Sequence, residues 1–351
     1  MTFRYIGSKA RITGALSAFI GAPGKSDGRF VDAFCGTGAV AEAAARLGWP
    51  VLLNDSLKSA VTMAAARLLA RTSVPFSRLG GYQNAINALN TLAPIEGFMW
   101  REYSPASGRR GAFERRYFTE HNAGLLDAMR AQLARWQNGG DVSQAEATLL
   151  IGDLLSAANR VANIAGTYGC FLAKWQPQSQ GAVTLVPREL FPTEVAVETT
   201  NSDVFSLAVA ERDLVYLDPP YTKRQYASYY HVLETLTEGD EPRVSGVSGL
   251  RPWKEKSSPF CYKRRALAAL VELIGNMPAK KVLLSYSDEG HVPIEPLVDG
   301  LSRFGKVELV ELASVGRYRP NKVASAARSE VSEHLIVVHR VVQTAKVRAA
   351  A

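Results

Sequence analysis

A strand–turn–helix–strand pattern near the start of the chain constrains the fold more than any other feature. Residues 29–34 (RFVDAF) and 51–54 (VLLN) are apolar runs of the kind that form strands buried on both faces. Between them, residues 39–47 are rich in Ala and contain neither Pro nor Gly, which favours a helix. A strand, a helix and a second strand in this order build a parallel sheet covered by helices. Similar apolar runs at 214–217, 281–287 and 335–339 predict that both ends of the chain contribute to one sheet.

Residues 76–190 differ in composition from the segments on either side. Pro, Gly, Asn, Arg and aromatic residues are frequent there, and the pattern at 144–164 predicts a helix. We interpret the chain as a doubly wound α/β domain formed by residues 1–75 and 191–345, with a smaller, mainly helical domain inserted at 76–190. A chain of 351 residues is long enough for both.

The sharpest local motif is an apolar strand that runs directly into Asp218, Pro219, Pro220 and Tyr221. Proline cannot continue a central strand, so strand pairing stops here, and ligands of open α/β sheets bind at the carboxyl ends of strands. Such a corner suits a flat exocyclic amine. Asp218 can accept one N–H, the Pro219 carbonyl can accept the second, and Tyr221 can stack on the ring. The alternative is a strand end with an incidental Pro-Pro turn.

A second motif, Asp32-Ala-Phe34-Cys-Gly36-Thr-Gly38, lies between the first predicted strand and the first predicted helix. Glycines in such a turn let the backbone approach a ligand, although the full G-x-G-x-x-G pattern is missing and a tight turn without a ligand is the alternative. Asp55 follows Asp32 by 23 residues, which is the spacing of an acid that binds ribose hydroxyls. The short glycine pattern argues against a pyrophosphate, whereas S-adenosylmethionine has a ribose and an ammonium group but no phosphate.

Four motifs together resemble the Dam-type adenine-N6 DNA methyltransferases: RYIGSK at 4–9, FVDAFCGTG at 30–38, ND at 54–55 and DPPY at 218–221, in that order. The resemblance covers residues 1–70 and 195–340. It implies a Rossmann-like methyltransferase sheet, S-adenosylmethionine as the cofactor, a target-recognition region in the insert and catalysis by residues 218–221. The cofactor-binding residues that the resemblance implies are Tyr5, Gly7, Ser8, Lys9, Asp32, Phe34, Gly36, Gly38, Asp55 and Asp203. For Asp203, the alternative to a cofactor contact is a helix cap or a turn.

The chain carries a formal net charge of +8, and its basic residues are concentrated after the Asp-Pro-Pro-Tyr corner. Residues 243–265 contain seven Lys or Arg, one acid and three aromatic residues. Basic and aromatic residues beside an active site suit phosphate contact and stacking on an extruded base, although a charge run is more often a solvated face. The predicted DNA contacts are Arg224, Tyr226, Arg251, Lys254, Lys256, Lys263 and Arg264.

Other classes of site are not indicated by the sequence. The five His form no paired ligand spacing, and the three Cys are odd in number and far apart. We therefore expect neither a metal nor a disulfide framework. No stretch reaches the roughly eighteen apolar residues of a membrane span, and the N-terminus has no apolar signal region. A cytoplasmic protein without a membrane partner is the expectation.

The resemblance implies an enzyme that transfers a methyl group from S-adenosylmethionine to the N6 amine of a flipped-out adenine in double-stranded DNA. It would act as the modification half of a restriction–modification system, with a cognate restriction endonuclease. The alternatives are an RNA adenine-N6 methyltransferase, a cytosine-N4 DNA methyltransferase and, from a different class, a cofactor-binding DNA-specificity protein without turnover. Asp218, the RYIGSK motif and the large insert favour adenine in DNA.

Overall fold

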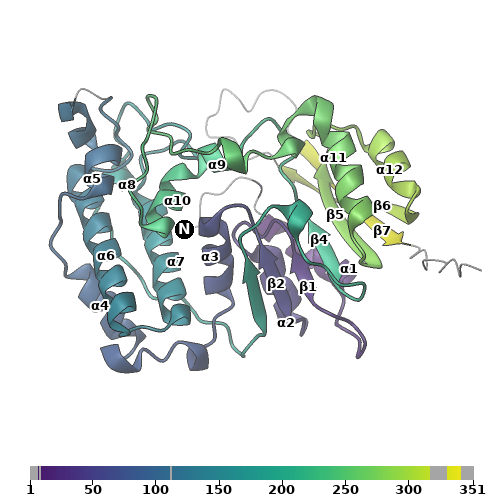
Figure 1. Ribbon diagram of the computed structural model, residues 1–351, viewed down its shortest axis with the longest axis horizontal. Helices are drawn as coiled ribbons and strands as arrows, with labels where there is room; N and C mark the ends of the chain where they lie inside the picture. The colour runs from purple at the N-terminus through teal and green to yellow at the C-terminus, as the bar shows by residue number, and fades with distance from the viewer. Residues whose placement is uncertain (1–6, 8, 111–112, 317–329, 341–351) are drawn as a thin grey trace, which may run out of the picture.

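The structure is organised around a seven-stranded sheet (Figure 1). The computed structural model describes residues 7, 9–110, 113–316 and 330–340. The strand order is β3-β2-β1-β4-β5-β7-β6; β1 to β5 are parallel, and β7 is antiparallel to both of its neighbours. The strands are β1 (Phe30–Asp32), β2 (Val51–Asn54), β3 (Val197–Thr200), β4 (Leu214–Leu217), β5 (Lys281–Ser287), β6 (Gly305–Gly316) and β7 (Glu330–Arg340).

Most of the α-helices fall into two groups (Figure 1). Those beside the sheet are α1 (Thr13–Ile20), α2 (Ala39–Arg46), α3 (Lys58–Arg67), α11 (Lys263–Asn276) and α12 (Ile294–Ser302). A separate helical layer contains α4 (Tyr82–Asn90), α5 (Phe98–Tyr103), α6 (Glu120–Gly139), α7 (Gln144–Val161) and α8 (Pro177–Gln180), while α9 (Tyr226–Tyr229) and α10 (His231–Glu238) follow β4. Within the described ranges, no helix has the length and apolar character needed to cross a bilayer.

Helices cover both faces of the sheet because its strands bury side chains on both sides. Phe30 of β1 shares a buried cluster with Leu16 of α1 and Val40 of α2. The next residue, Val31, belongs to a cluster on the opposite face that includes Leu270 of α11, as the alternation of side chains along a strand requires. The prediction of a doubly wound α/β sheet is confirmed.

Segments far apart in the sequence meet at the centre of the sheet. Phe30 of β1 pairs with Val51 of β2 on one side and with Leu214 of β4 on the other. The predicted strands at 51–54, 214–217 and 281–287 coincide with β2, β4 and β5, and the run at 335–339 is part of β7. Both ends of the chain therefore contribute to the sheet, as predicted.

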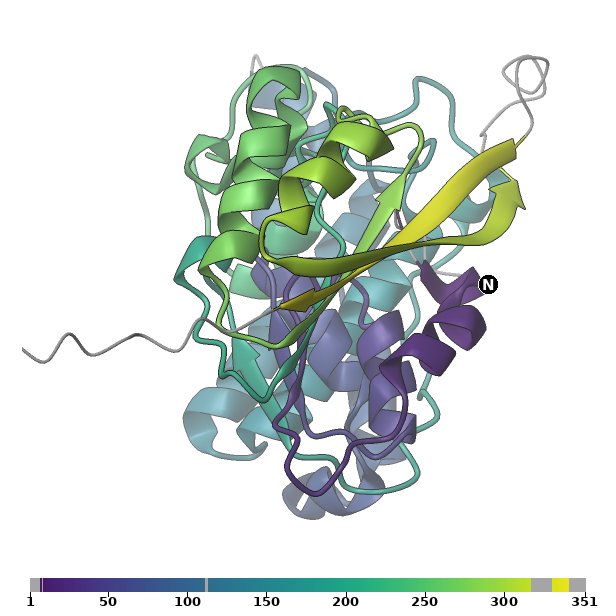
Figure 2. The ribbon, with the colours of Figure 1, turned by 90° about the vertical axis from the view of Figure 1, so that its right-hand side faces the viewer.

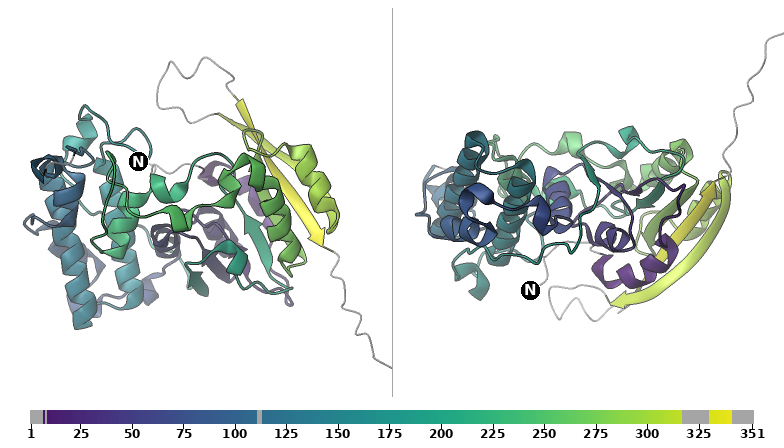
Figure 3. Two further views of the ribbon diagram at one scale, coloured as in Figure 1. Left: turned by 45° about the horizontal axis from the view of Figure 1, so that its top comes forward. Right: turned by 90° about the horizontal axis from the view of Figure 1, so that it is seen from below.

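The sequence patterns do not predict β3 and β6, the two strands at the edges of the sheet. Edge strands need less apolar surface than central ones, and the β3 sequence, VETT, is exposed or half-exposed throughout. Figure 2 shows β6 and β7 as a long curved pair. In the view from below, α1 lies inside this curve (Figure 3), and its Leu16 shares a cluster with Leu335 and Val337 of β7.

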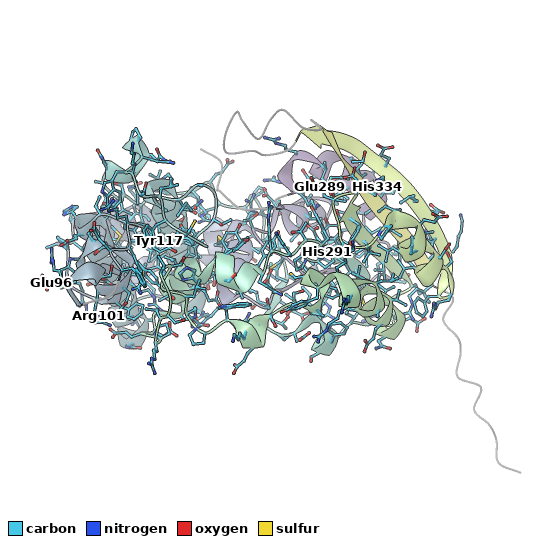
Figure 4. The ribbon with its side chains drawn as sticks, turned by 90° about the horizontal axis from the view of Figure 1, so that it is seen from above. Glu96, Arg101, Tyr117, Glu289, His291 and His334 are labelled. Atoms are coloured by element: carbon cyan, nitrogen blue, oxygen red, sulfur yellow. The ribbon has the colours of Figure 1, made fainter. Side chains whose placement is uncertain are left out.

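The segment 76–190 forms α4 to α8. Thr119 caps α6, and Ser143 and Glu146 form a capping box at the start of α7. Buried side chains of α4 to α7, together with Tyr117 (Figure 4), join side chains of α3 and α10 in one hydrophobic cluster. The helical layer thus shares its core with elements that precede and follow it in the sequence. The boundaries of the inserted domain stay a prediction.

The contact between α7 and α3 gives a test of this shared core. A Cβ added at Gly152 of α7 would lie 2.7 Å from the Cβ atom of Ala66 in α3. We expect Gly152→Val to push the two helices apart and to lower the free energy of unfolding by ~1–3 kcal/mol, measured by urea denaturation. Thr148→Val, at a half-exposed position of α7, is the control and should change stability by less than ~0.5 kcal/mol. Equal stability of the two variants would contradict the close approach.

Candidate active site

The carboxyl ends of β1, β2 and β4 form one edge of the sheet, and polar residues gather there. The strands are parallel and Asp32 pairs with both Leu53 and Tyr216, so the residues that follow these strands lie close together. They form a pocket with residues from the N-terminus and from the segment after α10. The residues that line it include Gly7, Lys9, Asp32, Phe34, Gly36, Asp55, Tyr216, Asp218, Pro220, Gln225, Tyr226, Lys256 and Ser258.

Asp218 begins the corner that ends β4. Its Oδ1 atom lies 3.3 Å from the Nζ atom of Lys9. Burial raises the pKa of Asp218 to about 7; the Lys9 ammonium lowers it, and the carboxylate of Glu333 raises it. A carboxyl group with this pKa accepts hydrogen bonds when ionised and can take up a proton near neutral pH.

Lys9 is buried and has two acidic partners. Its Nζ atom donates a hydrogen bond to Glu333 Oε2 at 2.8 Å and lies 5.3 Å from the centre of the Tyr221 ring. Burial alone would lower the pKa of Lys9, but Asp218, Tyr221 and Glu333 outweigh that effect and raise it. Glu333 is not predicted from the sequence, because a single acid before the apolar run of β7 belongs to no motif.

Asp32 has an unsatisfied oxygen in the pocket. Its side chain is buried, and its Oδ1 atom has no hydrogen-bond partner among the described residues. Burial raises the pKa of Asp32 to about 8, and the neighbouring carboxyl groups of Asp218 and Asp55 add to the shift. Because an unpaired buried oxygen is costly, this side chain is suited to a ligand with a cationic or hydrogen-bond-donating group.

Asp55, which follows β2, fixes the turn after β1. Its carboxylate accepts hydrogen bonds from the backbone N–H groups of Gly36 (3.1 Å) and Leu57 (3.0 Å). Burial raises its pKa to about 6, and these two N–H groups partly offset the shift. Gly38 is not among the residues that line the pocket, so its contact with a cofactor stays a prediction. Its φ is +78°, and an added Cβ would lie 2.7 Å from the Cα atom of Ala64 in α3, so this glycine permits close packing of α2 and α3.

Two further predicted cofactor residues line the pocket. Phe34 contacts Phe260 edge to face, with 5.7 Å between the ring centres. Gly7 has a φ of +76°, and an added Cβ would lie 2.8 Å from the hydroxyl oxygen of Tyr226. Phe34 and Gly7 therefore both form part of the pocket wall. Because Gly7 has no side chain, Tyr226 can approach it closely.

The remaining cofactor predictions lie elsewhere. Asp203 is exposed and is not among the residues that line the pocket. Its carboxylate accepts a hydrogen bond from the Phe205 N–H and caps a 3₁₀ helix, Val204–Ser206. A contact between Asp203 and a cofactor stays a prediction. Tyr5 and Ser8 lie outside the described residues.

The seven predicted DNA contacts separate into two groups. Tyr226 and Lys256 line the pocket, and Lys256 forms an ion pair with the buried Glu234 at 2.9 Å. Arg251 forms an ion pair with Asp240, also at 2.9 Å. Contacts within the protein account for the positions of these three side chains. The other four are exposed: Arg224, Lys254, Lys263 and Arg264.

Glu234 of α10 connects the pocket to the start of α3. One carboxylate oxygen accepts hydrogen bonds from the Lys58 N–H and from Lys256 Nζ, and the other accepts from the N–H and the hydroxyl of Ser59. Burial alone would raise the pKa of Glu234, but Lys256 and Ser59 hold it below its usual range. Glu234 therefore caps the unpaired N–H groups of α3 and holds Lys256 at the pocket. No local pattern marks this residue in the sequence.

The arrangement favours binding and orientation of two reactants over covalent catalysis. Asp218 and Pro220 of the corner at 218–221 line the pocket, whereas Pro219 and Tyr221 are not among its lining residues. Cys35 is also in the pocket lining, but burial raises the pKa of its thiol well above the usual range, which opposes formation of a nucleophilic thiolate. In the part of the chain that the structure describes, no group of three or more His, Cys, Asp or Glu side chains could hold a metal ion.

Residues 5–293 match the family described as D12 class N6 adenine-specific DNA methyltransferase. The matched range includes the turn after β1, the helical layer and the Asp-Pro-Pro-Tyr corner.

Three curated relatives give the extent of the similarity. The chain is 32% identical over 344 residues to Type II methyltransferase M.FokI of Planomicrobium okeanokoites. The aligned region covers 96% of this chain and 52% of that protein. It is 29% identical over 324 residues to Type II methyltransferase M.NlaIII of Neisseria lactamica, covering 88% and 90%. It is 31% identical over 316 residues to Type II methyltransferase M.CviAII of Paramecium bursaria Chlorella virus 1, covering 89% and 90%. The chain thus spans about half the length of M.FokI.

The raised pKa of Asp32 predicts how the ligand-free protein responds to pH. The folded protein binds more protons than the unfolded chain between the unfolded pKa of Asp, near 4, and the folded pKa of Asp32, about 8, so its stability falls as the pH rises through this window. We expect Asp32→Asn to gain at least ~1 kcal/mol of stability relative to the parent between about pH 5 and pH 8.5, measured by urea unfolding. Asp299→Asn, on the surface of α12, is the control. Parallel pH profiles of Asp32→Asn and the parent would contradict the prediction.

Proposed function

The chain belongs to the D12 class of N6 adenine-specific DNA methyltransferases, and from this premise we propose that it methylates the N6 amine of a flipped-out adenine in duplex DNA. The observation that carries the proposal is the corner at 218–221, whose acid lines the same pocket as Asp32 and Asp55. An amine acceptor site and a cofactor pocket are thereby adjacent, as direct transfer between two bound reactants requires.

S-adenosylmethionine is the proposed cofactor, and it supplies a methyl group already activated by a sulfonium centre. The residues present fit this molecule. The unsatisfied oxygen of Asp32 suits the ammonium group of its amino-acid part, and Asp55 follows β2 where an acid can bind ribose hydroxyls. Phe34 and Gly7 contribute to the same pocket. Asp203 remains a proposed contact for the adenine amine of the cofactor.

The Asp-Pro-Pro-Tyr corner would hold the target base. Asp218 accepts a hydrogen bond from one N6 hydrogen, the Pro219 carbonyl accepts one from the other, and Tyr221 stacks on the ring. Accepting both hydrogens draws the amine toward the tetrahedral geometry that a nucleophile needs. Orientation of the two reactants supplies much of the acceleration, because the methyl group needs no further activation.

The amine must lose one proton after the methyl group has been transferred. No strong base is needed beforehand, since the new bond itself acidifies the amine. Asp218 contacts the amine in the proposed complex, and its pKa of about 7 lets it accept the released proton near neutral pH. Lys9, 3.3 Å from Asp218, favours the ionised carboxylate before this step.

Exposed cations near the corner support a DNA-contacting surface. Extrusion of a base from the stack costs a few kcal/mol, which contacts to DNA must offset. Lys263 and Arg264 open α11, where the helix dipole disfavours positive charge unless an anion such as a phosphate lies nearby. With Arg224 and Lys254 they form the proposed phosphate-contact set. Arg251 and Lys256 are left out of this set because their cationic groups already have acidic partners.

A cognate restriction endonuclease is the proposed biological partner. Among the relatives are proteins named Modification methylase StsI, of Streptococcus sanguinis, and Modification methylase LlaI, of Lactococcus lactis subsp. lactis. By analogy with these names, this chain would mark the sites that such an endonuclease cuts when they are unmodified. The reaction would take place in the cytoplasm.

One experiment distinguishes this function from its alternatives. The protein is incubated with S-adenosylmethionine labelled in its methyl group, together with plasmid DNA or RNA, and the modified base and its flanking sequence are mapped. Label on adenine N6 in DNA supports the proposal. Label on cytosine N4 or on RNA supports one of the enzymatic alternatives, and binding of cofactor and DNA without label transfer supports a specificity protein.

Removal of the catalytic acid should separate methyl transfer from cofactor binding. We expect Asp218→Ala to lower label transfer at least ~100-fold, because the amine loses its acceptor. The cofactor dissociation constant, measured by calorimetry, should change by less than about threefold, since Asp32 and Asp55 remain. Lys9 keeps its hydrogen bond to Glu333, so the fold should survive the change. Comparable turnover of this variant and of an Asp299→Ala control would contradict the assignment.

DNA affinity should depend steeply on salt, because phosphate contacts release counterions. We expect the double variant Lys263→Ser, Arg264→Ser to reduce the slope of log affinity against log salt by about one to two, measured by fluorescence anisotropy on duplex DNA. Lys280→Ser is the control. This exposed residue immediately precedes β5, so it lies at the amino ends of the parallel strands, whereas the pocket lies at their carboxyl ends. An unchanged slope in the double variant would place the DNA elsewhere.

A further inference from the structure

A second carboxylate reaches the catalytic corner from near the C-terminal end of the described chain. Glu333 lies on β7 and pairs with Ser287, the last residue of β5. Its neighbour on β7, His334, and His291 of the loop after β5 are both labelled in Figure 4. The His291 backbone N–H donates a hydrogen bond to the Tyr221 carbonyl at 2.8 Å. The loop after β5 therefore contacts Tyr221 of the catalytic corner directly, and β7 places Glu333 beside the same residue.

The two oxygens of Glu333 contact two different functional groups. Oε2 accepts a hydrogen bond from Lys9 Nζ at 2.8 Å, and Oε1 accepts one from the Tyr221 hydroxyl at 3.4 Å. Lys9 in turn lies 3.3 Å from Asp218 and over the Tyr221 ring. One side chain thus links the cation beside the proposed amine acceptor to the ring that would stack on the base.

Stability alone gives a poor account of this arrangement. A buried ion pair contributes little net stability once the loss of hydration is included. Here one ammonium faces two carboxylates, and the second carboxylate raises the pKa of Asp218 by repulsion. The side chain of Glu333 is only 14% exposed, so water relieves little of that repulsion. The gain that remains is geometric: Lys9 and Tyr221 are held in one arrangement.

We propose that Glu333 is a positioning residue, which fixes the Lys9 ammonium beside Asp218 and the Tyr221 ring at the corner so that the target amine meets its acceptor in the reactive orientation. This role rests on the proposed methyltransferase function. Glu333 itself touches neither reactant. Displacement of a reacting group by about 1 Å costs roughly 100-fold in rate, so the effect of losing this support should appear in turnover.

The test compares turnover with binding in Glu333→Ala and Glu333→Gln. We expect Glu333→Ala to lower kcat for label transfer ~10–100-fold, with less than about a threefold change in the cofactor dissociation constant. Glu333→Gln should lose less, because its amide oxygen can still accept one of the two hydrogen bonds. Glu308→Ala, in β6, where the side chain is 42% exposed, is the matched control and should keep the parent turnover. Unchanged kcat in both Glu333 variants would overturn the proposal.

A mutant cycle tests whether Glu333 acts through its two partners. If it works through Lys9 and the Tyr221 hydroxyl, then Glu333→Ala should reduce kcat by less than about twofold when Lys9→Met and Tyr221→Phe are both already present. A full, independent loss in that background would reveal a merely structural role and overturn the proposal.

A second cycle, read by thermal unfolding, tests the contact between Lys9 and Glu333 without the need for activity. The losses in Tm of Lys9→Met and Glu333→Gln should not add in the double variant, because both break one ion pair. If the parent transfers no label to any nucleic acid, the proposed function fails, and additive Tm losses would then overturn the contact between Lys9 and Glu333 as well. Non-additive Tm losses in an inactive parent would support the contact between Lys9 and Glu333 on which the positioning role rests. They would locate the failure in the proposed reaction.

Discussion

The burial of three carboxyl groups at one edge of the sheet is the constraint on which the site depends. Asp32, Asp55 and Asp218 follow or end neighbouring parallel strands, so the sheet forces them together, and burial is the main cause of the raised pKa of each. Among the described residues, two cations, Lys9 and Lys256, line the pocket at this edge. Lys9 contacts Asp218, and Lys256 lowers the pKa of Asp55. The Oδ1 atom of Asp32 has no hydrogen-bond partner in the described part of the chain, so the pocket suits a ligand with a cationic or hydrogen-bond-donating group.

The charged groups that surround these carboxylates come from distant parts of the sequence. Lys9 precedes the first strand, Glu333 lies on the penultimate strand of the sheet order, and Lys256 lies in an irregular segment held by Glu234 of α10. Lys9 donates a hydrogen bond to the half-buried Glu333, and Lys256 donates one to the buried Glu234, so none of these positions depends on local structure alone. The pocket therefore forms only when the N-terminal, central and C-terminal segments have all reached the sheet.

Short-range patterns suffice for the central sheet and for the residues that follow its strands, because both depend on neighbours in sequence. Mostly apolar runs predict β2, β4 and β5, and the turn and corner motifs place Asp32, Asp55 and Asp218 at strand ends. Edge strands such as β3 carry no comparable apolar signal. Counting charges also fails to separate exposed cations from paired ones, which is why Arg251 and Lys256 fall into one group with Lys263 in the sequence but not in the structure. Glu333 and Glu234 act only through tertiary contacts, so no local pattern can reveal them.

Helix α3 links the pocket to the helical layer by direct packing. It begins three residues after Asp55, and Glu234 caps its N-terminus while holding Lys256 at the pocket. On one side, Ala64 leaves room for only a glycine at position 38 of the turn after β1; on the other, Ala66 faces Gly152 of α7 at a distance that excludes a larger side chain. A helix with close contacts on both sides cannot shift relative to one without disturbing the other, because packed interiors resist small displacements. If DNA binds to the helical layer, as the resemblance implies for a target-recognition region, α3 is the element through which its position would be transmitted to the cofactor pocket.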